Sequence, residues 1–240
     1  MTVKFLPCGD SAVVVEFGTE IDRDVSEQVL RLGARISTAR LAGVIETVPT
    51  FRSLMVHYDP MQTSSAALVD AIGALLGQAA ALEQRQRLWR VPVCYEGEYA
   101  PDLASVAERT GLTAAEVIGL HSRTQYHVYM IGFLPGFPYM GDLPARLALP
   151  RRVDPRVRVP AGSVAIATSM TAVYPIESPG GWHLIGTTPI GLFDIASTPP
   201  ALLAPGDAVR FDPIGQDAFA EIRAAVERGS YQVPHERMVA

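Results

Sequence analysis

The first 85 residues combine two kinds of hydrophobic pattern. Four short runs are rich in alternating or β-branched apolar side chains, as strands are: residues 3–8, 12–17, 44–49 and 53–58. Two longer stretches repeat apolar residues every three or four positions, as amphipathic helices do: residues 22–37, with Asp22 or Asp24 as the N-cap, and residues 64–82. This order of elements predicts a small α+β domain, ββαββα, over residues 1–85.

The pattern changes after a charged stretch at residues 83–90, which we interpret as a junction between domains. A strand is predicted over residues 88–95. Pro92 favours an edge position for this strand, because proline has no N–H to donate to a neighbour. Two helices are predicted next: residues 102–110 and residues 113–121, the second with Thr113 and Glu116 in the spacing of a capping box.

The remainder of the chain predicts a mostly-β domain. A strand is expected at residues 124–131, and from residue 157 onward short β runs alternate with turns that contain glycine or proline. Regular short strands of this kind are typical of a sandwich or a barrel. A helix near residues 216–228 is expected to close the fold, and the last dozen residues to form a tail. The second domain is therefore predicted over residues 86–240.

A stretch rich in glycine and proline runs from Tyr126 to Asp194 and has no continuous helical or strand period. Its first part contains an aromatic–proline loop with Phe133, Pro135, Phe137 and Tyr139. Prolines stiffen such a loop before any ligand arrives, which lowers the ordering cost of binding. The same composition is typical of a surface on which another protein packs. We interpret the loop as a pocket wall or a partner-binding surface.

The sharpest local motif, here called the glycine motif, contains Ser178, Gly180, Gly181 and Trp182. Paired glycines let the backbone pass close to a ligand and present successive N–H groups to a carboxylate or phosphate oxygen. Trp182 would then supply an apolar wall. The alternative is a tight turn between two barrel strands, with the tryptophan in the core.

Charged side chains lie near this motif in the sequence. Arg158 is suited to bind a carboxylate through two parallel hydrogen bonds. The preceding arginines, Arg151, Arg152 and Arg156, are expected on a solvated or partner-facing surface.

Three residues are candidate acid–base groups: Glu177, His127 and His183. A histidine within a strand more often has a structural role, and that alternative stays open for both histidines. The hydroxyl of Thr188 is a candidate hydrogen-bond donor.

Composition narrows the chemistry further. The net charge of −5 argues against a nucleic-acid or anionic-membrane partner. Lys4 is the only lysine, so a Schiff-base, P-loop or general-base lysine is not expected. Cys8 and Cys94 are too few for a disulfide framework and have no close metal-ligand neighbours, so we expect no metal site. No apolar run approaches the ~20 residues that span a bilayer, and a cytoplasmic location is expected.

The chain resembles the KipI / allophanate-hydrolase-subunit-1 family in five segments: GDSAVVVEFG, VPVCYEGEYAPDLASVA, GFLPGFPYMGDL, PRVRVPAGSVAIA and TAVYPIESPGGWHLIGTTP. The resemblance extends from Pro7 to about Ile214. It implies an α+β N-terminal domain followed by a mostly-β, cyclophilin-like barrel domain.

The family includes the PxpB-type subunit of 5-oxoprolinase, and the resemblance implies a corresponding activity. This activity is ATP-dependent hydrolysis of 5-oxo-L-proline to L-glutamate, carried out with a KipA/PxpC-like subunit and a PxpA-like subunit. ATP then belongs to the complex, and the missing P-loop suggests that a partner holds it. The family also leaves open a KipI-like inhibitor of a histidine kinase, and an allophanate hydrolase or urea carboxylase-type subunit.

The resemblance directs attention to two loops as donors for a carboxylate or a developing oxyanion: residues 160–163 and 178–181. The expected substrate-binding residues are Arg158, Pro160, Ala161, Gly162, Ser163, Thr171, Tyr174, Ser178, Gly180, Gly181, Trp182 and Thr188. One segment departs from the family, which has glycine at the positions of Ala165, Thr168 and Ala172 and glutamine at that of Met170. If this segment lines the site, the pocket is smaller and less polar than in the family.

Overall fold

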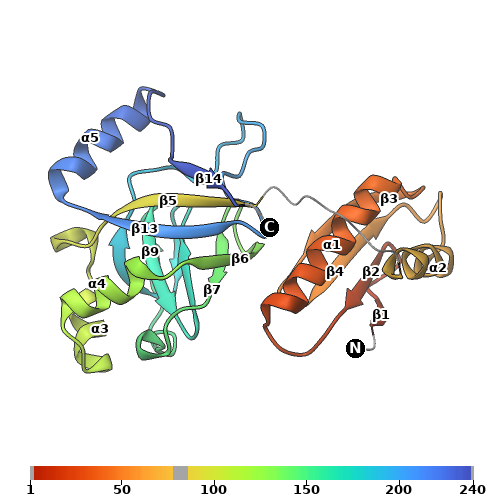
Figure 1. Ribbon diagram of the computed structural model, residues 1–240, viewed down its shortest axis with the longest axis horizontal. Helices are drawn as coiled ribbons and strands as arrows, with labels where there is room; N and C mark the ends of the chain where they lie inside the picture. Colours follow the sequence, from red (N-terminus) through yellow and green to blue (C-terminus); the bar gives the residue numbers. More distant parts are fainter. Residues whose placement is uncertain (1–2, 78–85, 239–240) are drawn as a thin grey trace. The chain divides into compact units, whose positions relative to one another are not determined.

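The computed structural model describes residues 3–77 and 86–238. The chain divides into two compact units, Met1–Gln84 and Arg85–Ala240, and each is described by itself (Figure 1).

The N-terminal unit is an antiparallel sheet with two helices packed on it. The strand order is β1-β2-β4-β3: β1 (Lys4–Pro7), β2 (Ala12–Glu16), β4 (Ser53–Tyr58) and β3 (Val44–Pro49). The helices are α1 (Arg23–Ala39) and α2 (Ser65–Leu76). Along β4 every second residue is buried, because one face of the sheet lies against the helices.

The starts of both helices follow from their capping residues. Asp22 accepts a hydrogen bond from the N–H of Val25, and Ser64 accepts one from the N–H of Ala67. Asp22 is one of the two N-caps that the sequence predicts. The second helix ends at Leu76, and the predicted continuation beyond residue 77 lies outside the described residues.

Seven strands of the second unit form a closed barrel in the order β12-β9-β10-β7-β6-β13-β5, with β5 paired back to β12. The strands are β5 (Arg87–Cys94), β6 (Tyr126–Ile131), β7 (Pro138–Gly141), β9 (Ser163–Ala167), β10 (Met170–Val173), β12 (His183–Thr187) and β13 (Ala208–Ile214). Their inward-facing apolar side chains make one large core, so the predicted barrel is confirmed.

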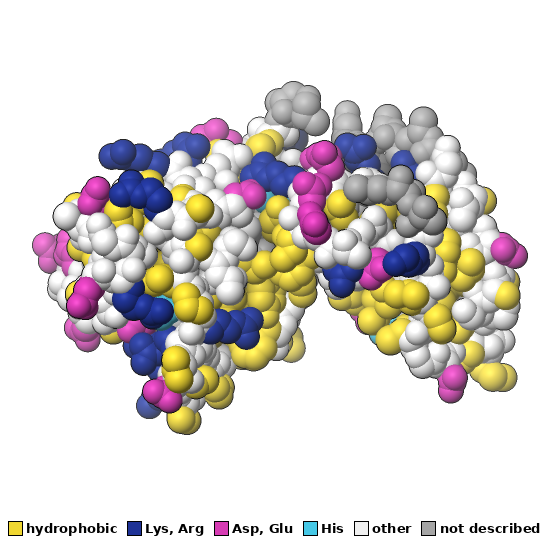
Figure 2. Space-filling model, turned by 90° about the horizontal axis from the view of Figure 1, so that it is seen from below, with side chains coloured by type: hydrophobic (Ala, Val, Ile, Leu, Met, Phe, Trp, Pro, Cys, Tyr) yellow, Lys and Arg dark blue, Asp and Glu magenta, His cyan; other side chains and the backbone are white. Residues whose placement is uncertain are grey.

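Shorter elements surround the barrel. A two-stranded ribbon is formed by β8 (Arg156–Val159) and β11 (Ser178–Gly180). The helices are η1 (Gly97–Tyr99), α3 (Leu103–Thr110), α4 (Ala114–Arg123), η2 (Ala145–Leu147) and α5 (Gln216–Glu227). The capping box predicted at Thr113 and Glu116 is present at the start of α4. Figure 2 shows Lys and Arg side chains interspersed with hydrophobic ones over the face of this unit, at the left.

Two sequence predictions about β5 and the C-terminal end were wrong. The strand that contains Pro92 is inside the closed barrel, not at an edge. The proline is tolerated because β5 changes partner there: β14 (His235–Arg237) pairs with residues 87–89, and β12 pairs at Cys94. The end of the chain is therefore not simply a tail, since β14 adds a strand to β5.

Candidate functional site

The structure brings the aromatic–proline loop and the glycine motif together. Together with Tyr174 they form an aromatic cluster of four rings: Phe137, Tyr139, Tyr174 and Trp182. Phe137 is at its centre, with its ring centroid 5.2 Å from that of Tyr174 and 6.0 Å from that of Trp182. Tyr139 lies 5.0 Å from Phe137 and 6.1 Å from Trp182. Edge-to-face contacts at such distances stabilise aromatic clusters. Two segments that are about 40 residues apart in the sequence thus form one aromatic cluster.

Gly180 is explained by this cluster and not by an anion-binding nest. A Cβ at Gly180 would collide with the hydroxyl end of Tyr174, so no larger residue fits while the tyrosine stays in place. Burial raises the pKa of Tyr174, although a hydrogen bond with the backbone of Trp182 and the charge of Arg151 oppose that rise. Neither Gly180 nor Gly181 has a positive φ, whereas a nest of N–H groups usually needs a left-handed residue.

The loop at residues 160–163 uses its donors internally. The N–H of Gly162 donates to the carbonyl of Tyr174 at 2.8 Å, and that of Ser163 donates to the carbonyl of Pro160 at 3.3 Å. The carbonyl of Gly162 accepts from the N–H of Thr188 at 2.9 Å. Ala161 and Pro160 are exposed at the turn. The loop therefore shapes the site more than it presents free N–H groups to a ligand.

Arg158 and Glu177 form an ion pair with each other. The Nε of Arg158 lies 2.6 Å from the carboxylate of Glu177, and their side chains are 77% and 49% exposed. The carboxylate partly balances the guanidinium, so a ligand carboxylate at Arg158 would compete with Glu177.

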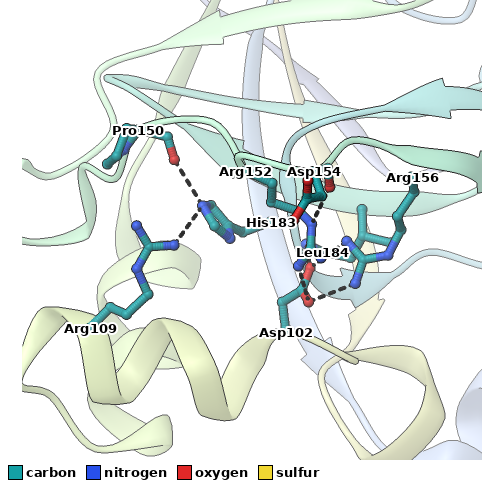
Figure 3. Close-up of polar contacts among 8 residues, drawn as sticks. All are labelled: Asp102, Arg109, Pro150, Arg152, Asp154, Arg156, His183 and Leu184. Carbon is teal, nitrogen blue, oxygen red and sulfur yellow. Dashed lines mark hydrogen bonds and ion pairs between the residues drawn. The ribbon is translucent and has the colours of Figure 1, made fainter.

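His183 lies buried at the start of β12 (Figure 3). Its Nε2 is 2.9 Å from the carbonyl oxygen of Pro150 and 3.4 Å from Nη1 of Arg109. The shorter contact requires a proton on Nε2, because a carbonyl oxygen can only accept. Nδ1 is buried and has no hydrogen-bond partner among the described residues. The hydrogen bond from His183 to the carbonyl of Pro150 thus fixes the backbone of the segment around Pro150 against the start of β12.

Asp102, which the sequence did not indicate as a site residue, lies between the side chains of Arg152 and Arg156 and the backbone of Leu184 (Figure 3). It is 5% exposed, and its carboxylate accepts hydrogen bonds from Arg156 at 2.7 and 2.9 Å and from Arg152 at 3.2 Å. The N–H of Leu184 donates to it at 2.7 Å. Burial raises its pKa, but the hydrogen bonds from Arg156 and Leu184 and the arginine charges lower it more. Arg152 and Arg156, expected on a solvated surface, are thus bound to a buried carboxylate.

Thr171 belongs to the interior of the barrel. Its hydroxyl donates to the carbonyl of Ala165 and accepts from Nε2 of His121 at 2.9 Å. The other ring nitrogen of His121, Nδ1, accepts from the hydroxyl of Tyr95 at 2.8 Å. His121 is stacked on Phe211 with 4.7 Å between ring centroids. Burial lowers the pKa of His121 to about 3, so the ring is neutral. This chain of hydrogen bonds supports the core and does not reach a surface site.

The remaining predicted residues differ in their exposure. His127, in β6, is buried with its ring 4.7 Å from that of Tyr129, and Thr188 is also buried. Ser178 is buried in the β8–β11 ribbon, with its hydroxyl on the carbonyl of Pro179. Phe133, in contrast, is 63% exposed and has a φ of 68°, a left-handed conformation that costs energy for an aromatic residue.

The described residues show few other candidate sites. A cavity of about 600 Å³ in the N-terminal unit is lined by Lys4, Glu16, Phe17 and residues between 18 and 25, none of them predicted for the site. No group of three or more metal-ligating side chains is placed to hold an ion within residues 3–77 and 86–238. In the same ranges no helix is long and apolar enough to cross a membrane.

Comparisons with known proteins agree with the resemblance seen in the sequence. Residues 3–203 match the model of the carboxyltransferase domain, subdomain C and D. The chain is 43% identical over 232 residues to the B subunit of 5-oxoprolinase from Bacillus subtilis, an alignment that covers 91% of this chain and 97% of that protein.

Two solved structures extend the comparison. TTHA0988 superposes with a TM-score of 0.76 at 37% identity, and the match covers 85% of this chain but only 40% of that longer one. The urea amidolyase of Kluyveromyces lactis superposes with a TM-score of 0.81 over 98% of this chain and 16% of that one; at 21% identity it shows a shared fold alone. This chain belongs to the carboxyltransferase-domain family, subdomains C and D, and within it to the group formed by the B subunits of bacterial 5-oxoprolinases.

Proposed function

We propose that the chain is the B subunit of a 5-oxoprolinase complex that hydrolyses 5-oxo-L-proline to L-glutamate at the expense of ATP. The observation that carries the proposal is the 43% identity to the B subunit of the Bacillus subtilis 5-oxoprolinase over 97% of that protein.

The chemistry explains why a complex with ATP is needed. A lactam carbonyl is a poor electrophile, so transfer of the γ-phosphoryl group of ATP to its oxygen would activate the carbon. Water then attacks that carbon and the ring C–N bond opens, which gives the amine of glutamate and an acyl phosphate at the former lactam carbon. A second water hydrolyses the acyl phosphate, so that phosphate leaves and the side-chain carboxylate of glutamate forms. This chain has one lysine and no P-loop, so we assign nucleotide binding mainly to the partner subunits.

The exposed residues beside the aromatic cluster support a role as one side of a shared site. Phe133 is 63% exposed, and Arg151 and Pro135 are also exposed around the aromatic cluster. An exposed aromatic side chain in a strained loop is the kind of residue on which a second subunit packs. We therefore propose a KipA/PxpC-like subunit as the partner at this face, with a PxpA-like subunit completing the enzyme.

The test is reconstitution from separately purified subunits. The expected result is ATP-dependent release of glutamate from 5-oxoproline only when all subunits are combined, with none from the isolated chain. Full activity from this chain alone would overturn the subunit proposal. Parallel assays of urea and allophanate turnover, and of histidine-kinase autophosphorylation, distinguish the two alternatives from the same purified material.

A further inference from the structure

Arg151 is an exposed arginine held against the aromatic cluster. Its guanidinium carbon lies 5.9 Å from the centroid of the Trp182 ring, in a cation–π contact. Among the described residues no carboxylate forms an ion pair with it. Stacking on an aromatic face leaves the edge of a guanidinium free to donate parallel hydrogen bonds.

The backbone on both sides of Arg151 is fixed. The carbonyl of Pro150, just before it, accepts from Nε2 of His183 at 2.9 Å. The N–H of Arg152, just after it, donates to the carbonyl of Gly181 at 2.7 Å. Gly181 and His183 flank Trp182 in the sequence, so the residues around the arginine are tied to the residues around its aromatic partner.

A second layer of contacts holds the same segment. The side chain of Arg152 is bound to the buried carboxylate of Asp102, which also binds Arg156 and the N–H of Leu184. The negative charge of Asp102 is therefore engaged by its own partners, and the positive charge of Arg151 stays uncompensated. A cation placed in this way before a ligand arrives loses little entropy on binding.

The influence of Arg151 reaches the phenols of the cluster. Burial raises the pKa of Tyr139 and of Tyr174, and the positive charge of Arg151 opposes the rise at both. The arginine thus lies at the place where the aromatic–proline loop and the glycine motif meet.

We propose that Arg151, and not Arg158, is the specificity-determining residue that binds the carboxylate of the substrate. The inference rests on the proposed function and assigns a residue to it. The carboxylate of 5-oxoproline takes no part in opening of the ring, so its capture would strengthen binding of the substrate and of the transition state equally. Arg158 is less suited because Glu177, at 2.6 Å, already balances its charge.

The test uses the reconstituted complex with Arg151→Gln. The expected result is a KM for 5-oxoproline raised about tenfold or more, with kcat changed far less, because the contact is made equally in the ground and transition states. Arg146→Gln is the matched control: this arginine is exposed on η2, and its contact with Glu116 at 3.9 Å is weak. Its KM is expected to stay within about twofold of the wild-type value.

Subunit affinity, measured in the same preparations, distinguishes a substrate contact from a partner contact. An unchanged KM in Arg151→Gln, or a loss explained wholly by weaker subunit assembly, would overturn the inference in favour of a partner carboxylate.

Binding without ATP separates this inference from the proposed function. In calorimetric titrations of the complex, Arg151→Gln is expected to weaken 5-oxoproline about tenfold and to leave 2-pyrrolidinone, the same ring without the carboxylate, unchanged. An inactive wild-type complex that still shows this difference would reject the function and retain the carboxylate site. An active complex without the difference would do the reverse.

Discussion

Asp102 and Arg156 form a two-point ion pair, with the guanidinium nitrogens 2.7 and 2.9 Å from the carboxylate oxygens. The pair ties the residue before α3 to the first residue of the β8–β11 ribbon. Because the aspartate also accepts from the N–H of Leu184, one buried carboxylate joins three separate segments of the second unit.

Asp102→Asn keeps the size of the side chain and removes its charge. It is expected to lower the free energy of unfolding by about 3 kcal/mol, since two partly buried arginines lose their counter-charge. Urea unfolding followed by tryptophan fluorescence measures the change in this unit, which contains both tryptophans. Asp154→Asn is the control, because only the backbone carbonyl of Asp154 accepts a hydrogen bond. Equal stability of the two variants would contradict the role of Asp102.

The same pair has a defined pH dependence. The pKa of Asp102 is lowered in the folded protein, so its contribution is complete above the unfolded pKa of about 3.9 and is lost as the pH falls below it. The stability difference between wild type and Asp102→Asn is therefore expected to be constant from about pH 5 to 8 and to shrink in more acidic solution.

His121 makes the barrel sensitive to mild acid. Its folded pKa of about 3 lies below the unfolded value of 6.5, so the unfolded chain binds the extra proton and stability is lost as the pH falls from 6.5 toward 3. The expected slope reaches about 1.4 kcal/mol per pH unit. The free energy of unfolding of His121→Gln should not show this loss between pH 6.5 and 3. His57→Gln, a substitution in the other unit, should still show it. A wild-type slope retained in His121→Gln would exclude the assignment.

Thr168 has a φ of 53° in the tight turn between β9 and β10, a conformation that a β-branched residue adopts only with strain. Thr168→Gly is expected to stabilise the protein by about 0.5 to 1 kcal/mol, the relief of strain exceeding the added freedom of the unfolded chain. The midpoint of urea unfolding measures the gain. Ser169→Gly, at a position without positive φ, should be neutral or slightly destabilising, and the same gain from both variants would refute the strain argument.

Phe133 offers a test of the proposed subunit interface. Phe133→Ala is expected to weaken binding of the KipA/PxpC-like subunit about tenfold or more, since truncation of an aromatic anchor at an interface has effects of that size. Folding stability should change little, because the side chain is 63% exposed. Calorimetric titration gives the affinity, and Ile195→Ala, 86% exposed, is the control outside the aromatic–proline loop. An affinity equal to that of the control would remove Phe133 from the interface.

The elements of this protein follow from local patterns in the sequence. The strands at Val44–Pro49 and Ser53–Tyr58 begin and end where the alternation predicts. Asp22 and Thr113 cap their helices because a capping bond joins residues only three positions apart. The short, regular strands predicted a sandwich or a barrel, and the five motif segments, taken together, indicated the family and with it the barrel.

The charged part of the candidate site could not be found in this way. Asp102 meets Arg152 and Arg156 across 50 and 54 residues, and no periodicity or spacing links positions so far apart. Arg158 and Arg151 look alike in the sequence, but Glu177 pairs with the first while the second lies on Trp182.

The sequence by itself therefore determined most of the helices and strands and the family, because these depend on local propensity and on motifs that follow one another along the chain. Only the tertiary structure decided which side chains are engaged and which are free. Ion pairs and burial depend on distances in space. Folding of the second unit brings Trp182 into contact with Phe137 and places Arg151 over the Trp182 ring.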